Sequence, residues 1–302
     1  MGSILNSVLW TVDPTAFSIF GMEIRWYGLL FAVGFLAGYY IEAKIFKNDK
    51  APDDWCDKLF IYTIVATIIG ARLGHCLFYG WSYYSAHPLE ILKVWEGGLA
   101  SHGGTIGIII AVLIYAKRVT HRNPLWVFDR LVIPTALVAA MIRTGNLMNH
   151  EIYGTETLMP WGFNFIENLS AWQYGMRPEF TMASHPTQIY EGLSYLLLFF
   201  VLMYMYWMRF AGDRRGLLFG TFMTWVFGSR FLIEFIKLPQ EAFEVGMKEA
   251  IFLNMGQILS IPFIILGIYF IYKAKKARKE SGMITHRHSH VRHHYKHKRG
   301  DV

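Results

Sequence analysis

Long apolar runs are the feature of this sequence that most limits its fold. Each approaches the roughly 20 residues that an α-helix needs to cross a bilayer. Since 54% of the 302 residues are hydrophobic, the runs indicate an all-α integral membrane protein, a bundle of about seven transmembrane helices. We predict spans near residues 26–46, 59–79, 98–117, 126–145, 187–208, 216–236 and 252–272.

Basic residues in the connecting segments predict the orientation of the bundle. Lys and Arg concentrate after the first, third, fifth and seventh spans and are sparse in the other connections. Because cytoplasmic segments carry the excess of Lys and Arg, we expect an extracytoplasmic N-terminus and a cytoplasmic C-terminus. The net charge of +7 lies mainly in those cytoplasmic segments, so nucleic acid is not an expected partner.

The chain divides into a polytopic membrane domain, residues 1–280, and a basic, histidine-rich tail, residues 281–302. We predict the tail to be disordered and cytoplasmic; the alternative is weak metal binding by its histidines. Within the membrane domain, residues 146–185 form the longest outward loop. Its aromatic residues suit the membrane interface, so we expect a small extracytoplasmic head there. Cys56 and Cys76 supply neither a disulfide framework nor a metal quartet.

Polar groups at the end of the fourth span mark the first candidate site. An unpaired charge inside a bilayer costs at least about 2.5 kcal/mol, so such groups usually face a cavity and serve function. In "MIRTGNLMNHEIYG", Arg143 and Asn146 share a helix face, and Glu151 is placed to pair with Arg143 or another cation. A guanidinium beside an amide is suited to holding a phosphate. The alternative is a helix end that satisfies its own carbonyls.

Three further motifs carry polar groups. "WVFGSRFLIEFIK" places Arg230 and Glu234 at i,i+4, either as part of a site or as a pair serving only assembly. "EGGLASHGGTIG" surrounds His102 with glycines, which favours a cavity lining able to exchange a proton over a buried structural histidine. "HPTQIYEG" supplies His185 at a helix start, with Gln188 and Glu191 on one i,i+3 face.

Two positions are ambiguous by sequence. Arg72 and His75 share a face of the second span, but Arg72 is equally suited to snorkelling from the helix end. Tyr27 lies at the outer end of the first span, where an interfacial tyrosine is ordinary. No metal-ligand spacing, serine-nucleophile motif or phosphate-binding glycine loop appears in the sequence, so we expect no metal site.

Together these motifs resemble the prolipoprotein diacylglyceryl transferase family of bacteria. "RTGNLMNHEIYG" is similar to its signature, a Gly-Asn pair followed by Asn149, Glu151 and Gly154. "RWYG", "GGLASHGG", "HPTQIYEG" and "GSRFLIEFIK" follow the family's order and spacing between about Arg25 and Lys237. The chain departs from the usual pattern at Ser101, Ile142 and His150.

The resemblance implies a transferase of the bacterial cytoplasmic (inner) membrane. Its reaction would move the sn-1,2-diacylglyceryl group of phosphatidylglycerol to the lipobox cysteine of a prolipoprotein signal peptide. The products would be a thioether and glycerol phosphate, in the first step of lipoprotein maturation. The expected partners are therefore phosphatidylglycerol, prolipoproteins and membrane lipids.

The resemblance also implies roles for individual residues, with no cofactor, since the donor lipid already carries a phosphate leaving group. Arg143 and Arg230 would hold the phosphate. His102 would be the base or proton relay, unless a phosphate oxygen polarised by an arginine takes the proton. The expected substrate-binding residues are Tyr27, Asn146, Asn149, Glu151, Gly154, His185, Gln188 and Glu234.

Three other functions remain open at this point. An anion transporter would use the same arginines and show flux in vesicles. A non-catalytic lipid-binding scaffold would tolerate the loss of His102. Another membrane lipid transferase would differ in the headgroup of its substrate.

Overall fold

The computed structural model describes residues 7–94, 97–209, 211–238 and 253–297, with side chains as far as residue 277. The chain forms two compact units, one of Met1–Gly38 with Val132–Val302 and the other of Tyr39–Leu131. Helices α1 and α5 each contribute residues to both units. We describe each unit by itself.

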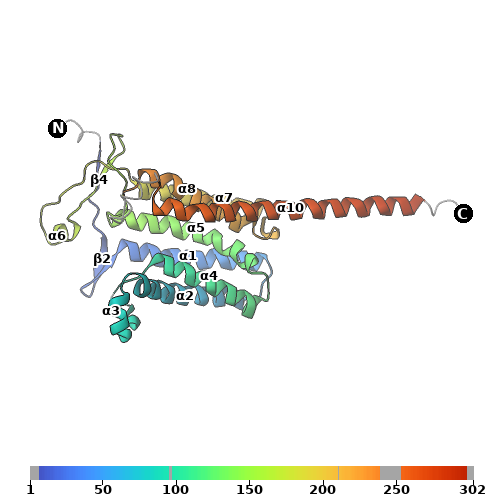
Figure 1. The fold of residues 1–302 in the computed structure, drawn as a ribbon, viewed down its shortest axis with the longest axis horizontal. Helices are drawn as coiled ribbons and strands as arrows, with labels where there is room; N and C mark the ends of the chain where they lie inside the picture. The colour runs from blue at the N-terminus through green and yellow to red at the C-terminus, as the bar shows by residue number, and fades with distance from the viewer. Residues whose placement is uncertain (1–6, 95–96, 210, 239–252, 298–302) are drawn as a thin grey trace. The chain divides into compact units, whose positions relative to one another are not determined.

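The described residues contain six helices long and apolar enough to cross a membrane (Figure 1). They are α1 (Trp26–Asn48), α2 (Asp54–Phe78), α4 (Ser101–Tyr115) with the π-helical turn η4 (Ala116–Thr120), α5 (Pro124–Met148), α7 (Thr187–Arg209) and α10 (Met255–His297). The remaining predicted span corresponds to α8 (Leu217–Ile233), which is 17 residues long. The predicted all-α membrane fold is confirmed.

The C-terminal part of α10 extends past its apolar portion. The apolar portion is Met255–Ala277, and the backbone remains helical to His297. Residues 281–297 thus continue α10, in a segment for which the sequence predicts disorder. The predicted disorder of residues 281–302 stays a prediction.

Short elements connect the spans. Strand β1 (Val8–Leu9) pairs in parallel with β4 (Phe163–Asn164), while β2 (Thr15–Ile19) and β3 (Met22–Arg25) form an antiparallel hairpin before α1. The others are α3 (Trp81–Ala86), η2 (Pro88–Leu92), α6 (Leu169–Gln173), η5 (Ala211–Asp213) and η6 (Glu234–Ile236). The β1–β4 pair joins the N-terminal segment to the predicted head segment, 146–185.

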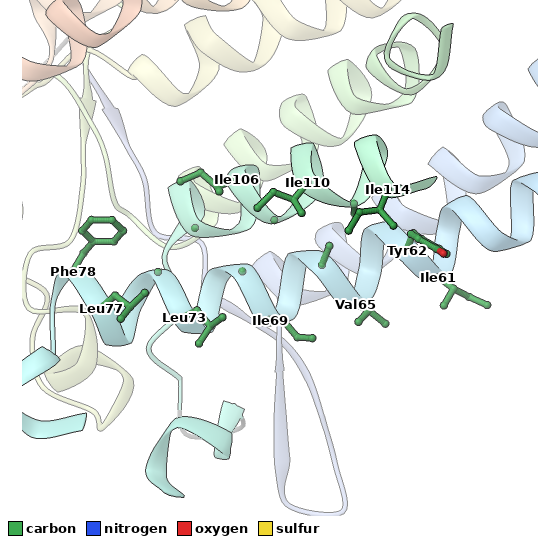
Figure 2. Close-up of a pocket in the computed structure, with 16 residues that line it drawn as sticks. Ile61, Tyr62, Val65, Ile69, Leu73, Leu77, Phe78, Ile106, Ile110 and Ile114 are labelled. Carbon is green, nitrogen blue, oxygen red and sulfur yellow. The ribbon is translucent and has the colours of Figure 1, made fainter. Parts of the chain in front are cut away.

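Glycines set the packing of α2 against α4 in the unit Tyr39–Leu131. A Cβ atom at Gly74 would lie 2.7 Å from the Cα atom of Gly103, and one at Gly107 would lie 3.2 Å from the Cα atom of Gly70. Backbones approach this closely only where side chains are absent, as at small-residue helix contacts in membranes. Figure 2 shows the apolar side chains of both helices along a groove of about 590 Å³ beside this contact.

Helices α7, α8 and α10 belong to the other unit, where Figure 1 shows α10 running beside α8. A Cβ atom at Gly220 would lie 2.7 Å from the carbonyl oxygen of Gly267, so small residues again allow close contact. At the start of α10, Asn254 and Gln257 exchange side-chain-to-backbone hydrogen bonds of 3.0 and 2.9 Å. This reciprocal capping fixes where α10 begins, next to the end of α8.

Candidate functional site

Arg143 and Asn146 lie together on the last turns of α5, as their spacing predicts. Arg143 Nη1 donates a hydrogen bond of 3.1 Å to Asn146 Oδ1. Asn146 Nδ2 in turn donates to Glu151 Oε1 at 2.8 Å, and Asn149 Nδ2 donates to the same oxygen at 3.2 Å. Glu151 therefore accepts hydrogen bonds from two amides. The carboxylate that pairs with Arg143 belongs to another residue.

That carboxylate is Glu191 of α7. It belongs to a charged chain of five ion-paired side chains, Arg143, Glu191, Lys237, Glu234 and Arg230. Arg143 Nε lies 2.6 Å from Glu191 Oε2, and Lys237 Nζ lies 3.6 Å from Glu191 Oε1. Lys237 Nζ is also 3.9 Å from Glu234 Oε2, which lies 3.9 Å from Arg230 Nε. The predicted Arg230–Glu234 pair is thus present but long. Lys237 joins it to the Arg143–Glu191 pair.

Exposure varies systematically along this chain. The central side chains of Glu191, Lys237 and Glu234 are 0%, 4% and 8% exposed. The terminal side chains of Arg143 and Arg230 are 16% and 41% exposed. The guanidinium groups are therefore the part of the charged chain most accessible to an anion. The buried carboxylates hold these groups from the protein interior. A guanidinium offers planar, paired donors suited to phosphate oxygens.

The loop after α5 is held in a strained conformation beside the charged chain of ion-paired side chains. His150 and Ile152 have φ angles of 55° and 62°, in the left-handed region that non-glycine residues rarely adopt. Gln188 Nε2 donates to the Glu151 carbonyl at 2.6 Å, and Thr187 Oγ1 donates to the Ile152 carbonyl at 2.7 Å. The first residues of α7 thereby fix the loop that carries Glu151. Gln188 acts here on the backbone.

His150 anchors the same loop to the N-terminal segment and the head. Its Nδ1 atom accepts the backbone N–H of Ile166 at 3.1 Å, so the proton must reside on Nε2, which donates to the Val12 carbonyl at 2.9 Å. Burial lowers the pKa of His150 below its ordinary value, which favours this neutral form. His150, where the sequence departs from the pattern of the family it resembles, therefore has a structural role: it holds the loop to both segments.

Two glycines permit close approaches at the site. A Cβ atom at Gly154 would lie 2.5 Å from the Ile236 carbonyl oxygen, and this glycine forms a β-bridge with Lys237. A Cβ atom at Gly145 would lie 2.8 Å from the ring of Tyr27. Tyr27 also interacts electrostatically with Glu151 and Arg143. The structure therefore brings Tyr27 to the site, which its sequence position alone does not indicate.

His185 lies just before α7. Its Nδ1 atom is 3.2 Å from the Tyr190 hydroxyl, which also accepts a 2.9 Å hydrogen bond from Trp161 Nε1. The carbonyl of His185 accepts the N–H of Gly154 at 2.8 Å. His185 thus connects the start of α7 to the loop that carries the signature motif.

His102 belongs to the other unit, where it is exposed near the start of α4. Its ring packs against those of Phe78 and Tyr79, with centroids 5.3 and 5.6 Å apart. The predicted cooperation of His102 with Arg143 and Arg230 joins residues of different units and stays a prediction.

Arg72 is resolved as a structural residue. It is buried and donates hydrogen bonds to the carbonyls of Glu90, Ile91 and Gly97 at 2.6, 3.0 and 2.6 Å. Its guanidinium therefore clamps the connection between α2 and α4. His75 beside it stacks on Tyr79 at a centroid distance of 5.9 Å.

Sequence reasoning missed Lys237 and Asn254 as contributors to the site, and it did not identify Glu191 as the partner of Arg143. Glu191 and Lys237 are central to the charged chain, and Asn254 Nδ2 donates to Glu234 Oε1 at 3.2 Å. Glu191 and Lys237 do stand inside the motifs "HPTQIYEG" and "GSRFLIEFIK". Glu191 also shares a helix face with Gln188, which was the available signal. Within the part of the chain that the structure describes, no group of three His, Cys, Asp or Glu residues is arranged to hold a metal ion.

Comparison of the sequence with known proteins shows the family to which the chain is similar. The sequence model described as "Prolipoprotein diacylglyceryl transferase" matches residues 14–273. A phosphatidylglycerol–prolipoprotein diacylglyceryl transferase of Porphyromonas gingivalis is 52% identical over 271 residues, which is 89% of this chain and 95% of that protein. Proteins of the same name from Chloroherpeton thalassium and Tolumonas auensis are 44% and 41% identical, covering 89% and 90% of this chain and 95% and 99% of their own lengths.

Proposed function

The chain belongs to the prolipoprotein diacylglyceryl transferase family, and on that premise we propose that Arg143 and Arg230 bind the phosphate of its lipid donor. It is a transferase that acts in the first step of lipoprotein maturation, with phosphatidylglycerol and a prolipoprotein as substrates. The observation that supports the phosphate site is the position of the two arginines at the less buried ends of a buried chain of ion pairs.

The reaction replaces a carbon–oxygen bond by a carbon–sulfur bond. The lipobox thiol loses its proton, and the sulfur attacks the diacylglyceryl carbon that is bonded to the phosphate oxygen. The electron pair of the broken bond leaves with glycerol phosphate, and the product is a thioether. Arg143 and Arg230 stabilise the negative charge that grows on the departing phosphate.

His102 is proposed to accept the thiol proton. A thiol must become a thiolate to act as a nucleophile, and a low-dielectric site disfavours that change without a base. His102 is exposed, so an incoming substrate can reach its ring. Imidazole also exchanges protons near neutral pH.

The remaining site residues hold the arginines or the donor. Asn146 hydrogen bonds Arg143, and Glu234 pairs with Arg230. Asn149 and Glu151 extend the Asn146 hydrogen bonds towards the headgroup, which Tyr27 also contacts. Gln188, His185 and Gly154 fix the signature loop through its backbone.

The site faces the extracytoplasmic side of the bacterial inner membrane in this proposal. The chain is a multi-pass membrane protein. The distribution of Lys and Arg among its loops supports an extracytoplasmic N-terminus and a cytoplasmic C-terminus. Single cysteines introduced at Thr157 and at Lys44, in a chain without Cys56 and Cys76, test this by labelling with a membrane-impermeant maleimide. Labelling of Lys44→Cys alone in spheroplasts would contradict the orientation.

The transfer itself is tested with purified protein in phosphatidylglycerol vesicles and a peptide that carries a lipobox cysteine. The assay measures diacylglyceryl peptide and glycerol phosphate for the wild type, Arg143→Ala, His102→Gln and the exposed control Arg118→Ala. Removal of one charge-stabilising donor typically lowers rates about 100- to 1000-fold, which we expect for Arg143→Ala. Unchanged turnover of folded Arg143→Ala would exclude the phosphate site. Unchanged turnover of His102→Gln would exclude the base.

A further inference from the structure

Lys237 occupies an unusual position for a lysine. Its side chain is 4% exposed, and its ammonium lies between two carboxylates, 3.6 Å from Glu191 and 3.9 Å from Glu234. Its backbone is fixed from two sides, by the β-bridge to Gly154 and by the N–H contact of 3.4 Å to the Glu234 carbonyl. A buried ammonium is costly unless carboxylates compensate it, and here two carboxylates share one.

We propose that Lys237 is a positioning residue that keeps both arginines available to the donor phosphate because its ammonium shares the negative charges of Glu191 and Glu234 with them. This inference rests on the proposed phosphate site of Arg143 and Arg230. Each carboxylate lies between an arginine and the same lysine, so neither carboxylate neutralises its arginine alone. The ion-paired chain contains three cations and two carboxylates, which leaves one positive charge.

Glu151, which reaches Arg143 through Asn146, is a further carboxylate at the site, so the positive charge that Lys237 adds offsets a carboxylate and favours the single negative charge of a phosphodiester. Without the lysine, Glu191 and Glu234 would each pair with one arginine only, and the chain would be neutral. Phosphate would then have to displace a carboxylate from a guanidinium. The affinity for phosphate would fall even though Arg143 and Arg230 are both still present.

The charge argument is tested on the full-length protein in detergent–phosphatidylglycerol mixed micelles. The measurements are the KM for phosphatidylglycerol, kcat, the inhibition constant of glycerol phosphate and the thermal unfolding midpoint. The variants are Lys237→Met, Lys237→Arg and the double variant Lys237→Met/Glu234→Gln. Lys58→Met is the matched control, because Lys58 is half-exposed and pairs with Asp54 on the surface of α2.

We expect Lys237→Met to raise both the KM and the glycerol phosphate inhibition constant about tenfold, equivalent to about 1.4 kcal/mol. Lys237→Arg should stay within about threefold of the wild type, because it conserves the charge. The double variant restores the single positive charge of the chain and should recover most of the lost affinity. Lys58→Met should change neither constant.

An unchanged inhibition constant in folded Lys237→Met would overturn the inference, as would a loss confined to kcat or to the unfolding midpoint. Failure of the double variant to recover affinity would do the same. If Lys237→Met does not fold, Glu234→Gln and the double variant replace it. Glu234→Gln alone should bind glycerol phosphate more tightly than the wild type, and adding Lys237→Met should reverse that gain. Equal binding by the two would refute the charge argument.

A parallel Arg143→Gln variant separates this inference from the proposed function. If Arg143→Gln leaves glycerol phosphate inhibition unchanged, the phosphate site itself is wrong. If Arg143→Gln abolishes inhibition while the Lys237 variants leave it unchanged, only the role of Lys237 is wrong.

Discussion

Gly103 and Gly104 are adjacent glycines with opposite surroundings, and replacing each by alanine tests how α2 and α4 are held together. A Cβ atom at Gly103 would lie 2.7 Å from the Cα atom of Gly74 and even closer to the Gly70 carbonyl oxygen. A Cβ atom at Gly104 would lie 3.6 Å from the Cβ atom of Ala71, an ordinary contact. Only Gly103→Ala should therefore disturb the helix pair.

The size of the effect follows from these distances. Carbon atoms in contact lie about 3.5–4.0 Å apart, so Gly103→Ala must separate the two backbones by about 1 Å. Overpacking of this kind costs about 1–3 kcal/mol. Gly104→Ala avoids that cost, and the helix-propensity gain of up to about 1 kcal/mol is common to both variants because both glycines lie in α4. The free energies of unfolding of the two variants should therefore differ by the overpacking cost, about 1–3 kcal/mol.

Unfolding in mixed micelles, followed by tryptophan fluorescence during denaturant titration, measures this difference directly. Gly103→Ala should unfold at lower denaturant concentration than the wild type, and Gly104→Ala at the same or a higher concentration. Equal stability of the two variants would show that α2 and α4 do not meet at Gly103, and the steric reasoning would be refuted.

Three further outcomes follow from the contacts of the site and its supports. Because burial lowers the pKa of His150, the unfolded protein binds a proton on this histidine more readily than the folded protein does. The stability from this histidine is therefore complete above about pH 6.5 and declines as the pH falls. His150→Gln should flatten this decline in unfolding midpoints measured between about pH 5 and 8. Arg72→Lys cannot span the carbonyls that Arg72 bridges, so about two hydrogen bonds to a charged group are lost and the free energy of unfolding should fall by about 3 kcal/mol. The loss should appear as faster proteolysis of residues 87–94, and an unchanged cleavage rate would contradict the clamp. Gly154→Ala should abolish transfer by breaking the bridge to Lys237 while the protein still inserts in membranes, and full activity would show that this bridge is dispensable.

The positions of the spans and the local pairs within them could be predicted from the sequence. Length and hydropathy fix where a chain crosses a bilayer, so α1, α2, α4, α5, α7, α8 and α10 form close to their predicted places. The spacings i,i+3 and i,i+4 fix which side chains share a helix face, so Arg143 meets Asn146 and Arg230 meets Glu234.

Only the tertiary structure decided how the local pairs combine. Helical periodicity says nothing about which face of one helix meets which face of another, so Glu191 was not identifiable as the partner of Arg143. Lys237 followed a predicted span and read as a loop residue, yet the fold buries it between two carboxylates. Arg72 carried the same intramembrane charge as Arg143, but the connection that folds over it satisfies its guanidinium with backbone carbonyls. A sequence shows that a buried charge needs compensation, whereas the fold determines which groups provide it.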